Sequence, residues 1–118
     1  MQTVLVVDDD RDVRKIAVEI LRLAGYRVIE AASATQALEA LAREPAVELL
    51  FTDIMMPEMS GFALSRRAKQ LHPGLRVLYT SGYVRDQPDG AWRAGNERLL
   101  QKPWRARQLR DEVQGVLG

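Results

Sequence analysis

Short strand-like segments alternate with stretches of helical periodicity along the whole of this 118-residue chain. The predicted strands cover residues 3–7, 27–31, 47–52, 75–80 and 98–101. The first and third are nearly continuous apolar runs, which is typical of strands buried on both faces of a parallel sheet. Short connections between alternating strands and helices require right-handed crossovers. The pattern therefore predicts one α/β domain, residues 1–118, with a doubly wound parallel sheet covered by helices on both faces.

The helices are predicted from apolar spacing and from residues typical of helix ends. They run from Asp10 to a terminating Gly25, from Ser33 to near Pro45, from Ser60 to Leu71, and from Trp104 to Leu117. Ser33 and Gln36 form a capping-box pattern, and Asp10 is expected to cap its helix. Pro88, Gly90 and Gly95 interrupt the stretch before the last strand, so only a short or irregular helix is expected around 91–93. His72, in a His-Pro-Gly sequence, is expected in a surface turn.

Composition excludes several classes of function. The net charge is only +1, so neither a nucleic-acid surface nor contact with a membrane surface is expected. The chain has no cysteine, which excludes disulfides, thiol nucleophiles and thiolate metal sites. No apolar run approaches the roughly 20 residues that a membrane span needs. These features favour a cytoplasmic location.

Acidic residues follow two of the predicted strands. Asp8 and Asp9 come directly after the first strand, and Asp53 comes directly after the third. Ligands of open α/β sheets bind outside the carboxyl ends of the strands, so these three side chains are expected to share one crevice. Two carboxylates about 5 Å apart repel by about 3 kcal/mol at an effective dielectric of about 20. A positive group must lie among them, and either Lys102 or a divalent metal with oxygen ligands could supply it.

Four motifs occur in order at the ends of the first, third, fourth and fifth predicted strands. They are Asp8-Asp9, Asp53-Ile54-Met55-Met56-Pro57 followed by Gly61, Thr80-Ser81-Gly82, and Lys102-Pro103. With these motifs the chain resembles the receiver domain of bacterial two-component response regulators (CheY-like, flavodoxin-like) from Val4 to about Val116. The sequence around the last two motifs is also similar to receivers of hybrid sensor histidine kinases. The resemblance implies a five-stranded sheet with strand order 2-1-3-4-5.

The resemblance further implies a phosphorylation-dependent signalling switch. Asp53 would be the nucleophile that accepts a phosphoryl group from a phosphohistidine of a histidine kinase or histidine phosphotransfer protein. Lys102 would contact a phosphoryl oxygen and the Asp53 carboxylate, and Ser81 would donate its hydroxyl to another phosphoryl oxygen. Such a domain assists its own phosphorylation and is not otherwise an enzyme. At the position three residues before Lys102, where many receivers carry a signalling aromatic residue, this chain has Leu99.

The cofactor that the resemblance implies is Mg²⁺. Asp9, Asp53 and the backbone carbonyl of Met55 would hold the ion, and Asp8 would act through a water molecule. An all-oxygen site that retains several waters suits the octahedral preference of magnesium.

Other functions are compatible with parts of this pattern. Asp8 and Asp9 could simply cap the first helix. A Mg²⁺-dependent phosphohydrolase would also use an aspartyl phosphate, but it needs a second acid where this chain has Met55. A dinucleotide-binding loop would need G-x-G-x-x-G where this chain has three aspartates. A receiver-like module used only for docking would not need the full set of acids and lysine.

Overall fold

The computed structural model describes residues 1–82 and 97–118, and within them it contains a five-stranded sheet. The strands are β1 Thr3–Val7, β2 Arg27–Ala31, β3 Val47–Asp53, β4 Arg76–Ser81 and β5 Arg98–Gln101. All neighbouring pairs are parallel and the order is β2-β1-β3-β4-β5, which confirms the predicted topology. β3 extends one position further than predicted, and β4 is shifted by one position toward the C-terminus, so Asp53 and Ser81 are the last residues of their strands.

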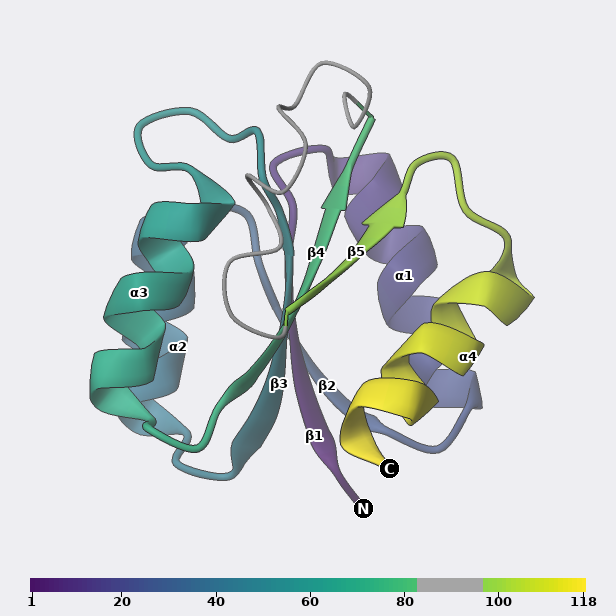
Figure 1. The fold of residues 1–118 in the computed structure, drawn as a ribbon, viewed down its shortest axis with the longest axis horizontal. Coiled ribbons are helices and arrows are strands. Elements are labelled where there is room, and N and C mark those ends of the chain that lie inside the picture. The colour runs from purple at the N-terminus through teal and green to yellow at the C-terminus, as the bar shows by residue number, and fades with distance from the viewer. Residues whose placement is uncertain (83–96) are drawn as a thin grey trace.

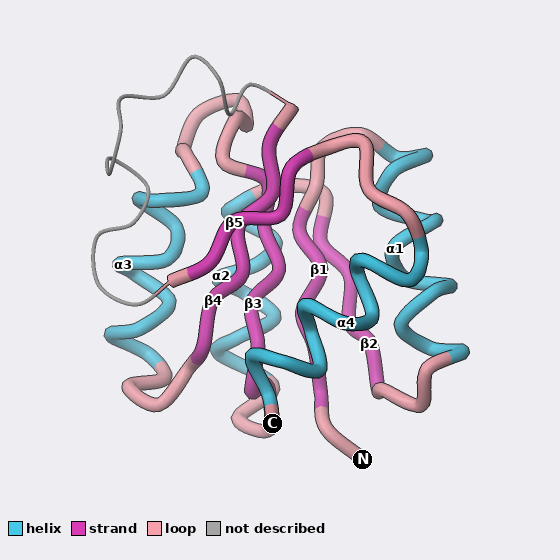
Figure 2. The backbone as a smooth tube through the Cα atoms, turned by 45° about the vertical axis from the view of Figure 1, so that its right-hand side comes forward, coloured by secondary structure: helices cyan, strands magenta, loops and turns pink. Residues whose placement is uncertain are grey.

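Helices cover both faces of the sheet. They are α1 Arg11–Leu23, α2 Ala34–Arg43, α3 Gly61–Leu71 and α4 Ala106–Leu117. α2 and α3 lie on one face and α1 and α4 on the other (Figure 1), and the turned view in Figure 2 shows the same layers. The helix expected around 91–93 falls outside the described residues. No helix within 1–82 or 97–118 is long and apolar enough to cross a membrane.

Each face of the sheet has its own hydrophobic core, because successive side chains of a strand point to opposite faces. Leu5 and Val7 of β1 pack toward α2 and α3, whereas Val4 and Val6 pack toward α1 and α4. All five residues of β1 are buried. This two-sided burial explains why the strand is almost entirely apolar, and it makes the sheet a rigid platform for the residues at its ends.

Most of the predicted helix ends are present. The Asp10 side chain accepts hydrogen bonds from the N–H groups of Asp12 and Val13 at the start of α1. Ser33 and Ser60 cap α2 and α3 in the same way. Gly25 follows α1 with a φ of 99°, a left-handed conformation that favours glycine.

Two local predictions were wrong. The Gln36 side chain accepts from the N–H of Ala32 and not from that of Ser33, so only the serine half of the capping box forms. α4 begins at Ala106 and not at Trp104. The Trp104 ring packs edge-on against Phe51 with centroids 6.2 Å apart, which holds the preceding chain outside the helix.

His72 is more than a residue of a surface turn. Its Nε2 atom lies 2.8 Å from the backbone carbonyl oxygen of Leu41, and the side chain is partly buried. The histidine therefore ties the end of α3 to α2.

Candidate functional site

The residues of the four motifs meet at the carboxyl edge of the sheet, the upper edge in Figure 1. Asp8 follows β1, Asp53 ends β3, Ser81 ends β4 and Lys102 follows β5. Parallel pairing aligns these ends, since Asp53 lies beside Thr80 in the register and Ser81 lies beside Gln101. The topology thus brings residues from distant parts of the sequence into one site.

Lys102 bridges two of the acids. Its Nζ atom lies 2.9 Å from Asp8 Oδ2 and 3.0 Å from Asp53 Oδ2. The side chains of Asp8 and Asp53 are only 4% and 9% exposed, so both ion pairs are largely shielded from water. The Lys102 N–H also donates to the carbonyl oxygen of Ser81 at 2.9 Å, which fixes the start of the lysine's loop against β4. The Lys102 ammonium group therefore lies between the two carboxylates and offsets their repulsion.

The Asp53 carboxyl group is in an unfavourable environment for its charge. Burial raises the pKa of Asp53 above its ordinary value, and the neighbouring Asp8 carboxylate adds to this effect. The Lys102 ammonium and the Met55 N–H, which donates to Oδ1 at 3.1 Å, oppose it. Burial alone would lower the pKa of Lys102, but its hydrogen bonds to Asp8 and Asp53 outweigh burial and raise it. The lysine stays charged while it neutralises only part of the acidic cluster.

Asp8 is held by contacts on every polar group. Its N–H donates to the carbonyl of Ala31, Oδ1 accepts from the Asp10 N–H, and Oδ2 accepts from Lys102. Its backbone carbonyl accepts from Arg14 Nη1 at 2.9 Å. Asp9, in contrast, is exposed. Asp8 is thus buried and fixed by hydrogen bonds, whereas Asp9 faces solvent.

The three acids could together hold a metal ion. One carboxylate oxygen from each of Asp8, Asp9 and Asp53 lies within 4.8 Å of the others. Three carboxylates beside one ammonium leave an excess of negative charge. All of these ligands are hard oxygen donors, which suits Mg²⁺ or Ca²⁺ and not a thiophilic metal. The donor set therefore fits the Mg²⁺ that the family resemblance implies.

The other predicted site residues differ in accessibility. Ser81 is fully buried, whereas the Met55 side chain is 53% exposed. Asp10 belongs to the helix cap and not to the acidic cluster, as the sequence predicted. Arg66 and Arg67 are exposed, which is typical of a solvated helix face.

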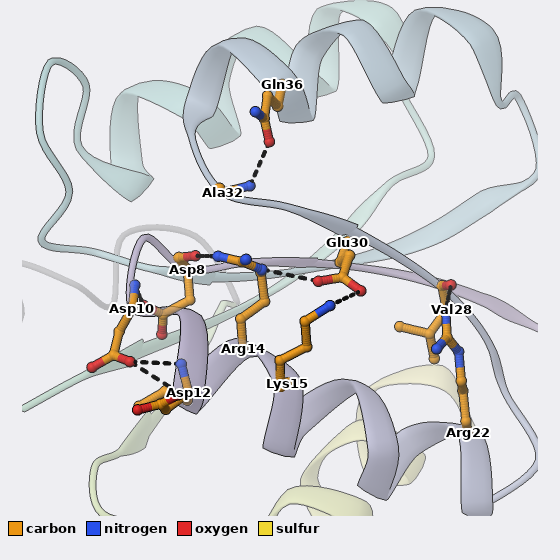
Figure 3. Close-up of polar contacts among 11 residues, drawn as sticks. Asp8, Asp10, Asp12, Arg14, Lys15, Arg22, Val28, Glu30, Ala32 and Gln36 are labelled. Carbon is orange, nitrogen blue, oxygen red and sulfur yellow. Dashed lines mark hydrogen bonds and ion pairs between the residues drawn. The ribbon is translucent and has the colours of Figure 1, made fainter.

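Sequence reasoning missed the residues that support the site from behind. Gly61 follows the Asp53 motif in the sequence, and a β-carbon there would lie 2.4 Å from the Asp53 carbonyl oxygen. Arg14 was not singled out, although its guanidinium reaches both Asp8 and Glu30 (Figure 3). The only signal for Arg14 was its position one turn into the helix that follows the acids.

Comparison with known proteins gives consistent matches. The profile of the family described as "Response regulator receiver domain" matches residues 4–114. The chain is 37% identical over 119 residues to the response regulator receiver protein CpdR of Brucella abortus, covering 99% of this chain and 98% of CpdR. It is 36% identical to the sensor kinase CckA of the same organism, covering 98% of this chain but 12% of CckA.

Solved structures give the same picture. The crystal structure of the receiver domain from the hybrid histidine kinase CckA matches with a TM-score of 0.86 and 29% identity, covering 98% of this chain and 99% of that one. A response regulator receiver domain from Clostridium thermocellum matches with a TM-score of 0.88 and 25% identity, covering 99% and 94%. Phosphorylation and Mg²⁺ are general properties of these domains. The chain belongs to the response regulator receiver domain family.

Proposed function

We propose that this receiver domain accepts a phosphoryl group on Asp53 from a phosphohistidine and acts as a phosphorylation-dependent switch. The observation that carries the proposal is the environment of Asp53. Its buried carboxylate is bonded to Lys102 and lies in a cluster with Asp8 and Asp9 at the open edge of the sheet. Burial makes its charge unfavourable, and the nearby groups are those that would neutralise an incoming phosphoryl group.

In the proposed reaction, an Asp53 carboxylate oxygen attacks phosphorus and the phosphorus–nitrogen bond of the phosphohistidine breaks. The electron pair of that bond stays on the leaving imidazole. Phosphoryl transfer of this kind depends mainly on positioning and on neutralisation of charge. Lys102 would donate to a phosphoryl oxygen from its place between Asp8 and Asp53, and the Ser81 hydroxyl would donate to another.

We assign the predicted Mg²⁺ to this cluster. Asp9, Asp53 and the backbone carbonyl of Met55 would hold the ion directly, and Asp8 would hold it through water. When bound, the ion supplies positive charge to the phosphoryl oxygens. The exposure of Asp9 supports this assignment, because a ligand facing solvent leaves room for the waters that magnesium retains.

The proposed partner is a histidine kinase or a histidine phosphotransfer protein. The matches to a free-standing receiver protein and to the receiver of a hybrid kinase support either setting for residues 1–118, which we take as one receiver domain. A downstream partner would recognise the phosphorylated form. The absence of cysteine suits a reducing cytoplasm.

Intact-mass measurement after incubation with acetyl phosphate and Mg²⁺ tests the proposal. We expect one added phosphoryl group on the wild type, none at this site on Asp53→Asn, and loss of labelling when Mg²⁺ is chelated. Asp10→Asn is the matched control, because asparagine also caps helices and Asp10 lies outside the cluster. Equal labelling of Asp53→Asn would refute the proposal. Release of many phosphates per protein from a phosphomonoester would favour the phosphohydrolase instead.

A further inference from the structure

Arg14 connects the acidic site to the second strand of the sheet. Its Nη1 donates to the backbone carbonyl of Asp8 at 2.9 Å, and its Nε donates to Glu30 Oε1 at 3.0 Å. Figure 3 shows the guanidinium extending from α1 between these two partners. The Arg14 side chain is only 12% exposed, so this is not a loose surface contact.

Glu30 in turn is fixed by two cations. Its Oε1 accepts from Arg14 and its Oε2 from Lys15 Nζ at 3.2 Å. Burial would raise the pKa of Glu30, but the bonds to Arg14 and Lys15 outweigh it and lower the pKa, so the carboxylate stays charged. Lys15 is 54% exposed, and of the two partners of Arg14 it contacts Glu30 alone. Arg14 and Lys15 therefore share one partner and differ in their contact with Asp8.

The carbonyl that Arg14 contacts belongs to the peptide joining Asp8 to Asp9. A peptide unit is planar, so holding its oxygen also fixes the nitrogen and the α-carbon of Asp9. Asp8 has further anchors through Ala31, Asp10 and Lys102. Asp9 is exposed, so the orientation of its backbone determines where its carboxylate can lie.

We propose that Arg14 is a positioning residue for the cation site: with Glu30 behind it, it holds the Asp8–Asp9 peptide so that the Asp9 carboxylate faces the cluster. The inference rests on the proposed function, because it assigns a support to the same site. Groups that orient metal ligands affect affinity strongly even though they do not touch the ion.

A purely electrostatic role predicts the opposite sign. The Arg14 guanidinium is a positive charge near the acids, so it repels Mg²⁺, and its removal would tighten binding if charge alone mattered. If Arg14 acts by positioning, its removal weakens binding despite the lost repulsion. The sign of the change separates the two roles.

The test measures Mg²⁺ affinity of the unphosphorylated protein by isothermal titration calorimetry for the wild type and three variants. We expect Arg14→Gln to weaken binding on the order of tenfold. Arg14→Lys keeps the charge but has one ammonium in place of a fork, so it should remain weaker than the wild type. Lys15→Gln is the matched control, and its affinity should change by less than about threefold, toward tighter binding.

Two further readouts separate positioning from a general loss of structure. The amide ¹H–¹⁵N signals of Asp9 and Asp10 should shift in Arg14→Gln but not in Lys15→Gln. At saturating Mg²⁺, Arg14→Gln should be phosphorylated by acetyl phosphate at a rate within about threefold of the wild type, because excess ion offsets weaker binding.

Unchanged or tighter Mg²⁺ binding by Arg14→Gln, full recovery in Arg14→Lys, or an equal loss in Lys15→Gln would overturn the inference. Absence of Mg²⁺ binding by the wild type at millimolar concentration would overturn it as well. A wild type that binds Mg²⁺ but takes no phosphoryl group would remove the proposed function and leave the comparison of Arg14 with Lys15 valid.

Discussion

The α-carbon of Gly61 packs against the main chain of Asp53, so closely that an added β-carbon would lie 2.4 Å from the Asp53 carbonyl oxygen. The same β-carbon would lie 3.0 Å from the α-carbon of Ile54. The Gly61 N–H donates to the carbonyl of Ile54 at 2.9 Å, so the start of α3 is bonded to the end of β3. The first residue of α3 thus supports the backbone that carries the proposed nucleophile.

Gly61→Ala is therefore expected to lower the free energy of unfolding by about 1–3 kcal/mol, as overpacking against a rigid backbone does. It should also slow phosphorylation, because Asp53 must shift. Gly74→Ala is the control, since a β-carbon there meets nothing within 4 Å, and it should be neutral or stabilising by about 0.4–1 kcal/mol. Urea unfolding measures both. Equal stability of the two variants would show that the close approach costs nothing.

Asp53→Asn should be more stable than the wild type at neutral pH without metal, by about 1 kcal/mol. Burial and Asp8 raise the pKa of Asp53 above 3.8, so the folded protein binds a proton more tightly than the unfolded chain. Stability of the wild type therefore falls as the pH rises from 3.8 through the folded pKa. Thermal unfolding in EDTA should show the advantage of Asp53→Asn shrinking as the pH is lowered. A wild type that is more stable at pH 7 would contradict this sign.

Lys102→Gln should lower stability by about 2–4 kcal/mol in the absence of metal, because it leaves two largely buried carboxylates without their cation. Its Mg²⁺ affinity should rise, since an ion no longer competes with the ammonium. The increase in melting temperature on adding Mg²⁺ should accordingly exceed that of the wild type. Phosphorylation should nonetheless be slower, because the proposed donor to the phosphoryl group is gone. Labelling as fast as in the wild type would remove that role from Lys102.

The titration of Tyr79 allows a test at alkaline pH, away from the candidate site. Its hydroxyl donates to Glu97 Oε1 at 3.0 Å, and Glu97 is also paired with Lys69. Burial raises the pKa of Tyr79 to about 12. The hydrogen bond with Ser65 opposes this effect, and the Glu97 carboxylate adds to it. Folding stability should therefore fall between pH 10.0 and about 12, because the unfolded tyrosine loses its proton first. Tyr79→Phe should remove that part of the decline in urea unfolding.

The strands and most helix ends could be predicted because their signals are local. Asp10, Ser33 and Ser60 cap helices through bonds to residues within a turn, and the nearly continuous apolar run of β1 indicates a buried strand. Ile16 shows the limit of such patterns. It has the helical spacing of a core residue, yet it is 53% exposed, because spacing gives a face of a helix and not how far the neighbouring layer extends.

The placement of the acids and Lys102 could be predicted because each lies at or just after the end of a strand, and the fold brings the strand ends together. Their supports could not. Arg14 donates to the backbone carbonyl of Asp8, a group that every residue has. Its second partner, Glu30, lies on another strand. The closeness of Gly61 to Asp53 depends on the path of the loop between them. A contact to a backbone atom does not require a particular residue type at the contacted position, so the sequence gives no sign of it.

Asp8 and Lys102 are joined by a bond across 94 positions of the chain. The ribosome synthesises the acids long before Lys102. In an incomplete chain the carboxylates therefore lack the ammonium group that offsets their repulsion. If the domain works as proposed, it can therefore accept a phosphoryl group only after its last strand has docked, and a truncated or partly unfolded copy would not be phosphorylated.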